Sequence, residues 1–174
     1  MTDTPPCPDE DNLPPKVPGR VQDEETLLRV ACQRDWLVHE PGRTTLSIAA
    51  FPKRHLQGQK GASVSLMRPA TPTDEVLKRA KALNREPKWS DDPVLGRCKA
   101  GTVRGVVDCD GRREFCVNAD VVTDALGELV THASLLRSCP VPDGKDRAEW
   151  SAVRLQLAQE FDEVRHHSGT SVKP

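Results

Sequence analysis

Apolar positions along the chain repeat every second residue in some stretches and at helical spacing in others. Leu46–Phe51 and Ala62–Met67 are short apolar runs that predict two strands, and the second run alternates polar and apolar residues as a half-buried strand does. Three further stretches predict strands: Val94–Cys98, Thr102–Cys109 and Glu114–Val117. Asp110-Gly111, between the last two, predicts a hairpin turn because glycine adopts positive φ without strain.

Helical spacing is clearest in two places. Residues 74–84 follow the capping residues Thr73 or Asp74, with acids in the first turn. Residues 146–166 carry a long stripe made of Trp150, Val153, Leu157, Phe161 and Val164. Other segments are ambiguous. Residues 23–32 suit a short helix or the start of a strand, Ala119–Leu126 suits a helix ending at Gly127, and Leu129–Leu136 suits either.

This order of elements predicts an α+β fold. We expect a single domain over residues 21–167, with a largely antiparallel sheet packed against the 74–84 and 146–166 helices. Residues 1–20 hold six prolines and four acids, which predicts a disordered N-terminal tail. Residues 168–174 are expected to form a flexible tail.

Charge and composition narrow the function classes. The net charge of −1 gives no global field toward nucleic acid or membranes. No apolar run approaches the roughly 18 residues that span a bilayer, and the acidic N-terminus is unlike a secretory signal. We therefore expect a cytoplasmic protein without membrane contact. The six scattered cysteines are expected to be reduced thiols.

Local charge is less even. The window from Pro41 to Thr73 contains no acid and five Lys or Arg residues. Cations and glycine-rich backbone attract phosphates, so this window predicts an anion- or partner-binding surface. Its residues are Arg43, Lys53, Arg54, His55, Lys60 and Arg68. The spacing differs from a phosphate-binding P-loop, and the loop lacks an aromatic to stack a base. A solvated connection between two strands is the simpler interpretation.

The sequence VVDCDG at residues 106–111 resembles the first motif of haloacid-dehalogenase-type phosphotransferases. The resemblance implies Asp108 as nucleophile and Asp110 as acid/base, with Mg²⁺ bridging. It ends at Arg112, and the parallel α/β domain that such enzymes need does not follow in the sequence. A hairpin with Asp-Gly at its turn explains the same residues.

Few other residues suggest metal binding or catalysis. The cysteines do not form a C-x-x-C pair, so neither a metal nor a cofactor is predicted. Cys–His pairs are conceivable between His132 and Cys116 or Cys139, and between His39 and Cys32. His132 stands among small and apolar residues, which favours a hydrogen-bonded, semi-buried histidine over a general base.

The leading hypothesis is therefore a small interaction or accessory protein, which binds a protein partner or a second copy of itself through the 146–166 helix. The first alternative is a small enzyme that holds a nucleotide or phosphate on the basic 43–68 segment. It is either of phosphoryl-handling type or similar to ADP-ribosyltransferase-like folds. In the second case the candidate functional residues are Arg29, Ser47 or Ser65, and an acid or His late in the chain. The second alternative is a nucleic-acid accessory protein that contacts phosphates at 53–61.

Overall fold

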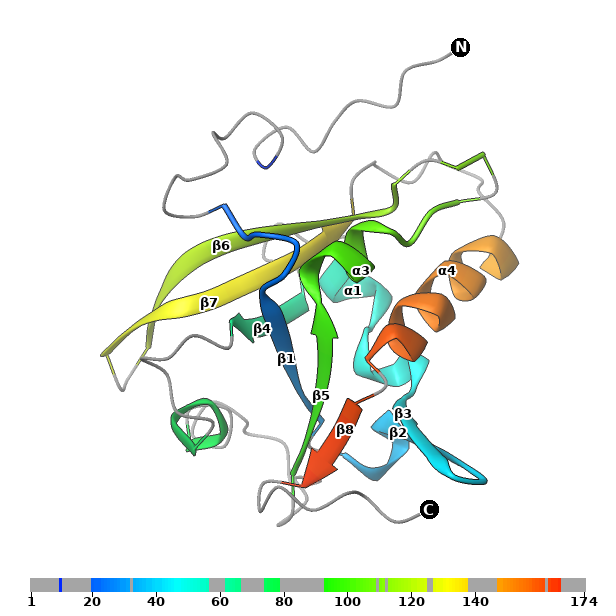
Figure 1. The fold of residues 1–174 in the computed structure, drawn as a ribbon, viewed down its shortest axis with the longest axis horizontal. Helices are drawn as coiled ribbons and strands as arrows, with labels where there is room; N and C mark the ends of the chain where they lie inside the picture. The colour runs from blue at the N-terminus through cyan, green and yellow to red at the C-terminus, as the bar shows by residue number, and fades with distance from the viewer. Residues whose placement is uncertain are drawn as a thin grey trace.

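The computed structural model has an α+β fold built around one antiparallel sheet (Figure 1). It describes residues 10, 20–31, 33–56, 62–66, 74–78, 93–108, 110–111, 113–124, 127–137, 147–161 and 163–166. The predicted fold class is confirmed. The predicted tails, 1–20 apart from Glu10 and Arg20, and 168–174, lie outside the described residues.

Six strands form the main sheet in the order β6-β7-β4-β1-β5-β8, and each neighbouring pair is antiparallel. Their bounds are β1 Thr26–Ala31, β4 Ala62–Leu66, β5 Val94–Lys99, β6 Phe115–Asp124, β7 Gly127–Arg137 and β8 Glu163–His166. A separate hairpin pairs β2 Leu37–Glu40 with β3 Arg43–Leu46. The described helices are η1 Arg34–Trp36, η2 Ile48–Ala50, α1 Lys53–Leu56, α3 Ala100–Arg104, α4 Arg147–Glu160 and a helical segment over residues 74–78.

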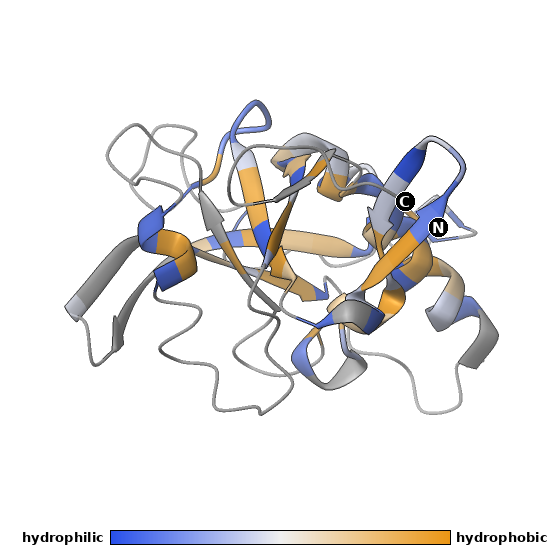
Figure 2. Ribbon diagram, turned by 90° about the horizontal axis from the view of Figure 1, so that it is seen from below, coloured by the Kyte–Doolittle hydropathy of each residue, from blue (hydrophilic) through white to orange (hydrophobic). Residues whose placement is uncertain are grey.

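The main core lies on one face of the sheet, beneath α4. The predicted apolar stripe of α4 is confirmed, because Trp150, Val153, Leu157 and Phe161 are all buried in the same cluster as Leu27 of β1. In Figure 2, hydrophobic positions, in orange, lie along α4 and along the strands of the sheet. Burial of this stripe is the largest contribution of α4 to stability.

The opposite face of the sheet is also covered in part. Leu28 and Leu95 alternate with core residues on β1 and β5, and they are buried outside the main cluster. The helical segment 74–78 lies on the other side of β1 and β5 from α4 (Figures 1 and 2), and it buries Val76 and Leu77. The rest of the helix predicted to 84 lies outside the described residues.

Two predicted strands are wrong in part. The run predicted over Thr102–Cys109 begins as helix α3, which buries Ala100 and Val103 at helical spacing. Its first turn is fixed by a tertiary contact, since the Gly101 N–H donates to the Asp23 carbonyl. The strand predicted over Leu46–Phe51 ends at Leu46, because the Ser47 hydroxyl caps η2 by accepting from the Ala49 N–H.

The C-terminal helix is shorter than predicted. It ends at Glu160, and Glu163–His166 instead form edge strand β8 on β5. Val164 belongs to the core in either conformation, so the apolar stripe could not reveal the break. The helix predicted for Ala119–Leu126 is likewise wrong, because β6 runs to Asp124 and turns into β7 at Gly127, whose φ is 98°. Leu129–Leu136, left open by the sequence, is part of strand β7.

The predicted Asp110-Gly111 hairpin is confirmed. Val107 bridges to Arg113 in antiparallel fashion, and Gly111 has a φ of 75°. The Asp108 carboxylate accepts from the Asp110 N–H at 2.9 Å, and the Asp108 carbonyl accepts from the Gly111 N–H at 3.0 Å. Since all described strand pairs in the sheet are antiparallel, the phosphotransferase interpretation of VVDCDG has no structural support here.

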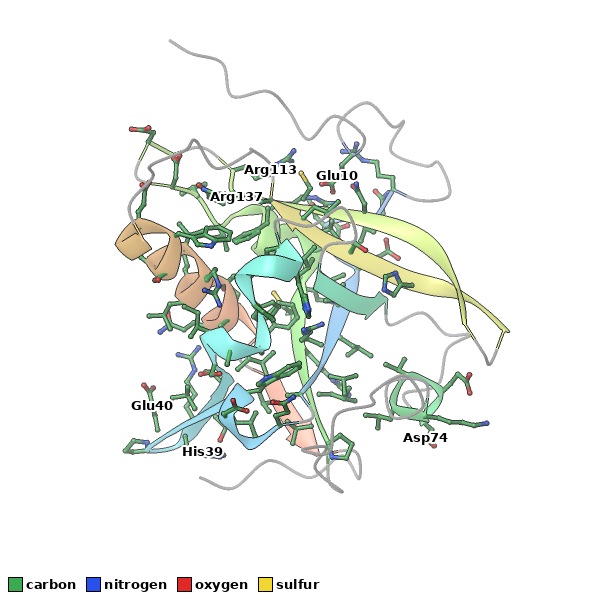
Figure 3. All side chains as sticks on the ribbon, turned by 180° about the vertical axis from the view of Figure 1, so that it is seen from behind. Glu10, His39, Glu40, Asp74, Arg113 and Arg137 are labelled. Carbon is green, nitrogen blue, oxygen red and sulfur yellow. The ribbon has the colours of Figure 1, made fainter. Side chains whose placement is uncertain are left out.

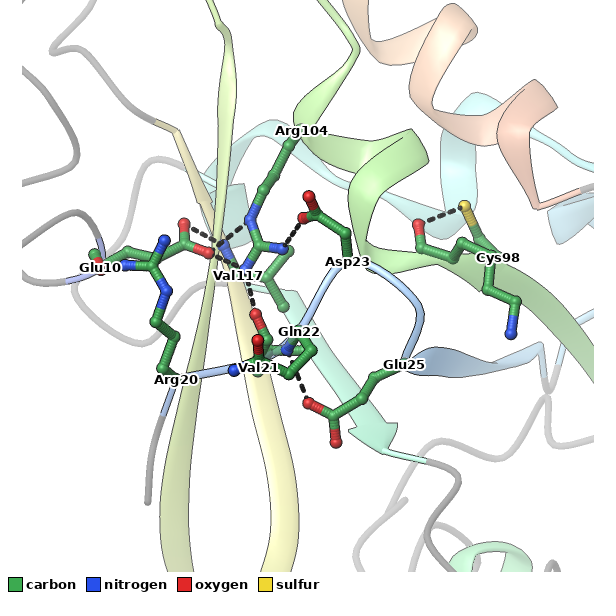
Figure 4. Close-up of polar contacts among 10 residues, drawn as sticks. Glu10, Arg20, Val21, Gln22, Asp23, Glu25, Cys98, Arg104 and Val117 are labelled. Carbon is green, nitrogen blue, oxygen red and sulfur yellow. Dashed lines mark hydrogen bonds and ion pairs between the residues drawn. The ribbon is translucent and has the colours of Figure 1, made fainter. Parts of the chain in front are cut away.

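A buried ion pair attaches Glu10 to the sheet (Figure 4). The Glu10 side chain is 1% exposed, and its carboxylate pairs with Arg104 of α3 and accepts from the Val117 N–H of β6 at 3.0 Å. Arg104 also pairs with the exposed Asp23 and donates to the Val21 carbonyl. These contacts fix Glu10 against the end of the sheet in a way that the sequence did not predict.

The cysteines differ from the expectation of reduced thiols. Cys116 on β6 is disulfide-bonded, and its partner lies outside the described residues. Cys98 is buried, forms no disulfide, and donates from its thiol to the Lys99 carbonyl. At least one covalent cross-link therefore holds the strand at the edge of the sheet.

Candidate functional site

The predicted basic surface is only partly described. Arg43 begins β3 and is exposed, and its Nη2 donates to the Gln159 carbonyl of α4 at 3.2 Å. Lys53, Arg54 and His55 belong to the single turn of α1, and Lys60 and Arg68 lie outside the described residues. The prediction that this set binds an anion or a partner is untested by the geometry.

Of the Cys–His pairs proposed for nucleophilic chemistry, only Cys116–His132 lies within the described residues, and the strand register keeps its two members apart. Cys116 is opposite Leu136, so it lies four residues along the ribbon from the His132 position, roughly 13 Å away at strand rise. His39 lies in the β2–β3 hairpin (Figure 3), where its Nδ1 is 3.1 Å from the Thr44 hydroxyl. Cys32 and Cys139 lie outside the described residues.

Arg29 also has a structural role. It is buried on the core face of β1, where it donates to the Ala50 carbonyl at 2.7 Å and lies against the rings of Trp36 and Phe51. Ser47 caps η2 and donates to the Asp35 carbonyl. Ser65 is opposite Leu28, on the other face of the sheet from Arg29. Of the ADP-ribosyltransferase-like alternatives, Arg29 and Ser65 therefore lie on opposite faces of the sheet, whereas Arg29 and Ser47 both bond to the η2 segment.

The strand register brings together a different set, on the face opposite the core. Asp120 of β6 is directly opposite His132 of β7, and His132 is directly opposite Ser65 of β4. Directly opposed residues of antiparallel strands lie on one face, with Cβ atoms about 4.5–5.5 Å apart. We call Asp120, His132 and Ser65 the polar row.

A second polar row runs beside the first. Asn118 of β6 is opposite Ser134 of β7, and Ser134 is opposite Ser63 of β4. Each member stands two residues from a member of the polar row on its own strand, so it lies on the same face about 6.7 Å away along the strand. By register, six positions with polar residues thus lie on one face of three adjacent strands, and we call them the polar patch.

A β-bulge lies next to His132 in the polar patch. Between the pairs Asp120–His132 and Val122–Leu129, β6 advances two residues and β7 advances three, which is a β-bulge. Bulges re-aim side chains and are common beside active sites. The bulge therefore gives β7 a local bend directly adjacent to the histidine.

Members of the polar patch differ in how deeply they are buried. Ser134 in the centre is 4% exposed, whereas His132 and Asn118 are half-buried. The expected semi-burial of His132 is confirmed, and His132 takes part in an interaction, while the expected hydrogen bond stays a prediction. His132 is half-buried, and its register partners are an aspartate on β6 and a serine on β4. These are the residue types of a system in which a histidine acts as general base for a serine.

Sequence reasoning considered His132 and Ser65 separately and missed Asp120. The three residues stand in segments 55 and 12 positions apart along the chain, so spacing carries no signal of their proximity. The misassigned helix at Ala119–Leu126 also hid the alternation that would have put Asn118 and Asp120 on one face. Only the register of β4, β7 and β6 assembles the patch.

Comparisons with known proteins add no further assignment. The chain matches no protein-family model, no curated protein and no solved structure. Across the part of the chain that the structure describes, no three His, Cys, Asp or Glu side chains gather as a metal site, and no helix is long and apolar enough to cross a membrane.

Proposed function

We propose that the protein is a small hydrolase that cleaves an ester, thioester or amide at the polar row. The observation that supports this proposal is the register in which His132 lies between a carboxylate position and a hydroxyl position on neighbouring strands. A base flanked by a nucleophile and an orienting acid is the arrangement that activates a serine hydroxyl, and it recurs on unrelated folds.

In the proposed reaction, one ring nitrogen of His132 accepts the Ser65 hydroxyl proton while Oγ bonds to the substrate carbonyl carbon. The carbonyl π pair moves onto oxygen and gives a tetrahedral oxyanion. The oxyanion collapses, the bond to the leaving group breaks, and His132 protonates that group. Water then repeats the cycle: His132 takes a proton from the water, and the resulting hydroxide adds to the acyl carbon. The bond to Ser65 Oγ breaks as His132 returns the proton to that oxygen, and the acid is released. Asp120 accepts a hydrogen bond from the other ring nitrogen and stabilises the imidazolium.

The direct test is active-site labelling with a fluorophosphonate, which reacts with activated serines. The full chain is incubated with the probe, and labelled peptides are mapped by mass spectrometry. We expect labelling of Ser65, its loss in Ser65→Ala and His132→Ala, and its retention in the control Ser151→Ala, a change at an exposed residue of α4. The proposal would be overturned if Ser65 is not labelled and if the unchanged protein hydrolyses p-nitrophenyl acetate no faster than Ser65→Ala does.

An interaction role remains a prediction. The α4 stripe expected to bind a partner is instead buried in the core, and only Leu155 among its large apolar residues is strongly exposed, at 44%. Self-association is checked by native mass spectrometry. Phosphate contact at 53–61 is checked by measuring nucleic-acid affinity at two salt concentrations, because phosphate contacts release counterions.

A cytoplasmic location also remains a prediction. The Cys116 disulfide weighs against it, because cytosolic reductants keep most thiols reduced. Thiol trapping in intact cells, followed by intact-mass analysis, shows whether the bond exists where the protein works.

A further inference from the structure

We infer that Glu10 is the internal ligand of a carboxylate-binding site at the edge of the sheet. An acidic peptide strand of another protein takes this site when Glu10 is displaced. Arg104 of α3, Val117 of β6 and Arg20 all contact Glu10 (Figure 4). The inference does not depend on the proposed hydrolase function, because it uses no residue of the polar row.

Arg104 gives the site its charge and its geometry. Its Nε donates to Glu10 Oε1 at 2.6 Å, and its Nη2 donates to the same oxygen. The other oxygen, Oε2, accepts from the Val117 N–H at 3.0 Å, so both carboxylate oxygens are bound. The side chains of Glu10 and Arg104 are 1% and 12% exposed, so water competes weakly with these charge-assisted bonds. A guanidinium and a backbone N–H that converge on one carboxylate recognise that group, whichever chain carries it.

Strand β6 adds the backbone of a sheet edge at the same place. It is the outermost strand beside β7, and Arg20 bridges to Asn118 in antiparallel fashion. The Val117 N–H bonds to the Glu10 carboxylate, which therefore takes the position of a carbonyl from a further strand. An extended peptide that pairs with β6 at Asn118 and places a carboxylate on Arg104 would reproduce the contacts of Arg20 and Glu10. Such strand addition combines backbone bonds with one specific side chain.

Glu10 also keeps external acids out of the site. Arg20 donates to the Glu10 carbonyl, and Arg104 contacts Asp23 and donates to the Val21 carbonyl at 2.6 Å. A ligand carried on the same chain competes at an effective concentration on the order of millimolar. An external acidic peptide therefore binds weakly while Glu10 is in the site, and more tightly once Glu10 is removed. Glu10 is in this sense an autoinhibitory contact.

The first experiment removes the internal ligand from the full chain. Glu10→Ala deletes one CH₂ and the carboxylate, which are the heavy atoms of acetate. We expect sodium acetate to raise the melting temperature of this variant by about 2–4 °C over sodium chloride at equal concentration. The unchanged protein and the control Glu24→Ala, a change at an exposed acid near the same edge, should show no such difference. Circular dichroism verifies that each variant is folded.

The second experiment measures peptide binding by fluorescence anisotropy. A labelled peptide of residues 8–20 stands in for the partner, and a second peptide carries Glu10→Gln. We expect the first peptide to bind the Glu10→Ala chain at least about tenfold more tightly than the unchanged chain. We expect the peptide with Glu10→Gln to bind that chain at least about tenfold more weakly, because it lacks the charge-assisted bonds. If Glu10→Ala does not fold, the full chain with Glu10→Gln, which keeps the side-chain shape, replaces it.

Three results would overturn the inference. Equal affinity of the first peptide for the two chains would show that Glu10 does not block the site. Equal affinity of the two peptides would show that the site does not recognise a carboxylate, and so would a folded Glu10→Ala chain that responds neither to acetate nor to peptide. If Glu10→Ala forms a dimer in native mass spectrometry that excludes the peptide, the occupant is a second copy and the assignment to another protein is wrong.

Discussion

The guanidinium of Arg154 on α4 donates to the backbone carbonyl of Phe51 at 2.8 Å, and it reaches the Ile48 carbonyl at 3.0 Å. The Ile48 carbonyl belongs to the η2 turn, where it also accepts from the Phe51 N–H at 3.2 Å, and the Phe51 carbonyl directly follows that turn. Burial lowers the pKa of Arg154 from its ordinary strongly basic value through desolvation. One arginine thus fastens α4 to the segment between β3 and α1.

Replacing this arginine tests that attachment. Arg154→Met keeps the apolar stem but leaves two carbonyls without their charged donor, so we expect a loss of about 1.5–3 kcal/mol in the free energy of unfolding. Urea denaturation measures it, with Gln156→Met at an exposed position of the same helix as control. Equal stability of the two variants would show that solvent satisfies these carbonyls.

The Glu10–Arg104 pair gives a second prediction. Arg104→Met leaves the buried Glu10 carboxylate without its cation, and we expect destabilisation of about 3–5 kcal/mol, typical for one half of a buried pair. Asp23→Asn is the control, because the Asp23 side chain is 66% exposed and its pair with Arg104 contributes about 0–1 kcal/mol. Comparable losses in both variants, measured by urea denaturation, would contradict the central role of Glu10.

Gly96 on β5 lies against Leu46 of β3, and this contact leads to a third prediction. A Cβ at Gly96 would stand 2.7 Å from Leu46 Cδ1, which is shorter than any ordinary contact. We expect Gly96→Ala to cost about 1–3 kcal/mol through overpacking. Combining it with Leu46→Val should recover part of the loss, so the double variant is less destabilised than the sum of the single ones. Additive losses in chemical denaturation would show that the two sites do not share this space.

The disulfide of Cys116 gives a fourth prediction. Intact mass under non-reducing conditions should show the bond, and Cys116→Ser should lower the free energy of unfolding by about 2–4 kcal/mol. Cys98, which is buried and forms no disulfide, should react with a thiol reagent only in denaturant. Immediate labelling of Cys116 in the folded, unreduced protein would contradict the cross-link.

The polar row gives a fifth prediction, on kinetics. Asp120→Asn keeps the size of the side chain but removes the charge that would orient and stabilise His132, so we expect kcat for p-nitrophenyl acetate to fall about 10⁴-fold. Asp124→Asn, at the register pair with Gly127 at the end of β6, is the matched control and should retain activity. A fall of less than tenfold at Asp120 would remove the acid from the proposed mechanism.

The sequence by itself determined the α+β class, the apolar stripe of α4 and the Asp110-Gly111 turn. Each of these follows from local information: helical or alternating periodicity, or a glycine whose φ of 75° other residues rarely adopt. The semi-buried state of His132 was also predictable, because its neighbours in the chain are small and apolar.

The tertiary structure alone decided which residues meet. Residues 163–166 form a strand rather than a helix because they pair with β5. The hydrogen bond from the Gly101 N–H to the Asp23 carbonyl holds α3 where a strand was expected. Glu10 reaches Arg104 across 94 positions, and Ser65, His132 and Asp120 become neighbours only through the β4–β7–β6 register. Register depends on the packing of whole strands, since a shift of one residue moves every side chain to the other face. A single sequence carries no local signal for that choice, so the polar patch could be found only in the folded chain.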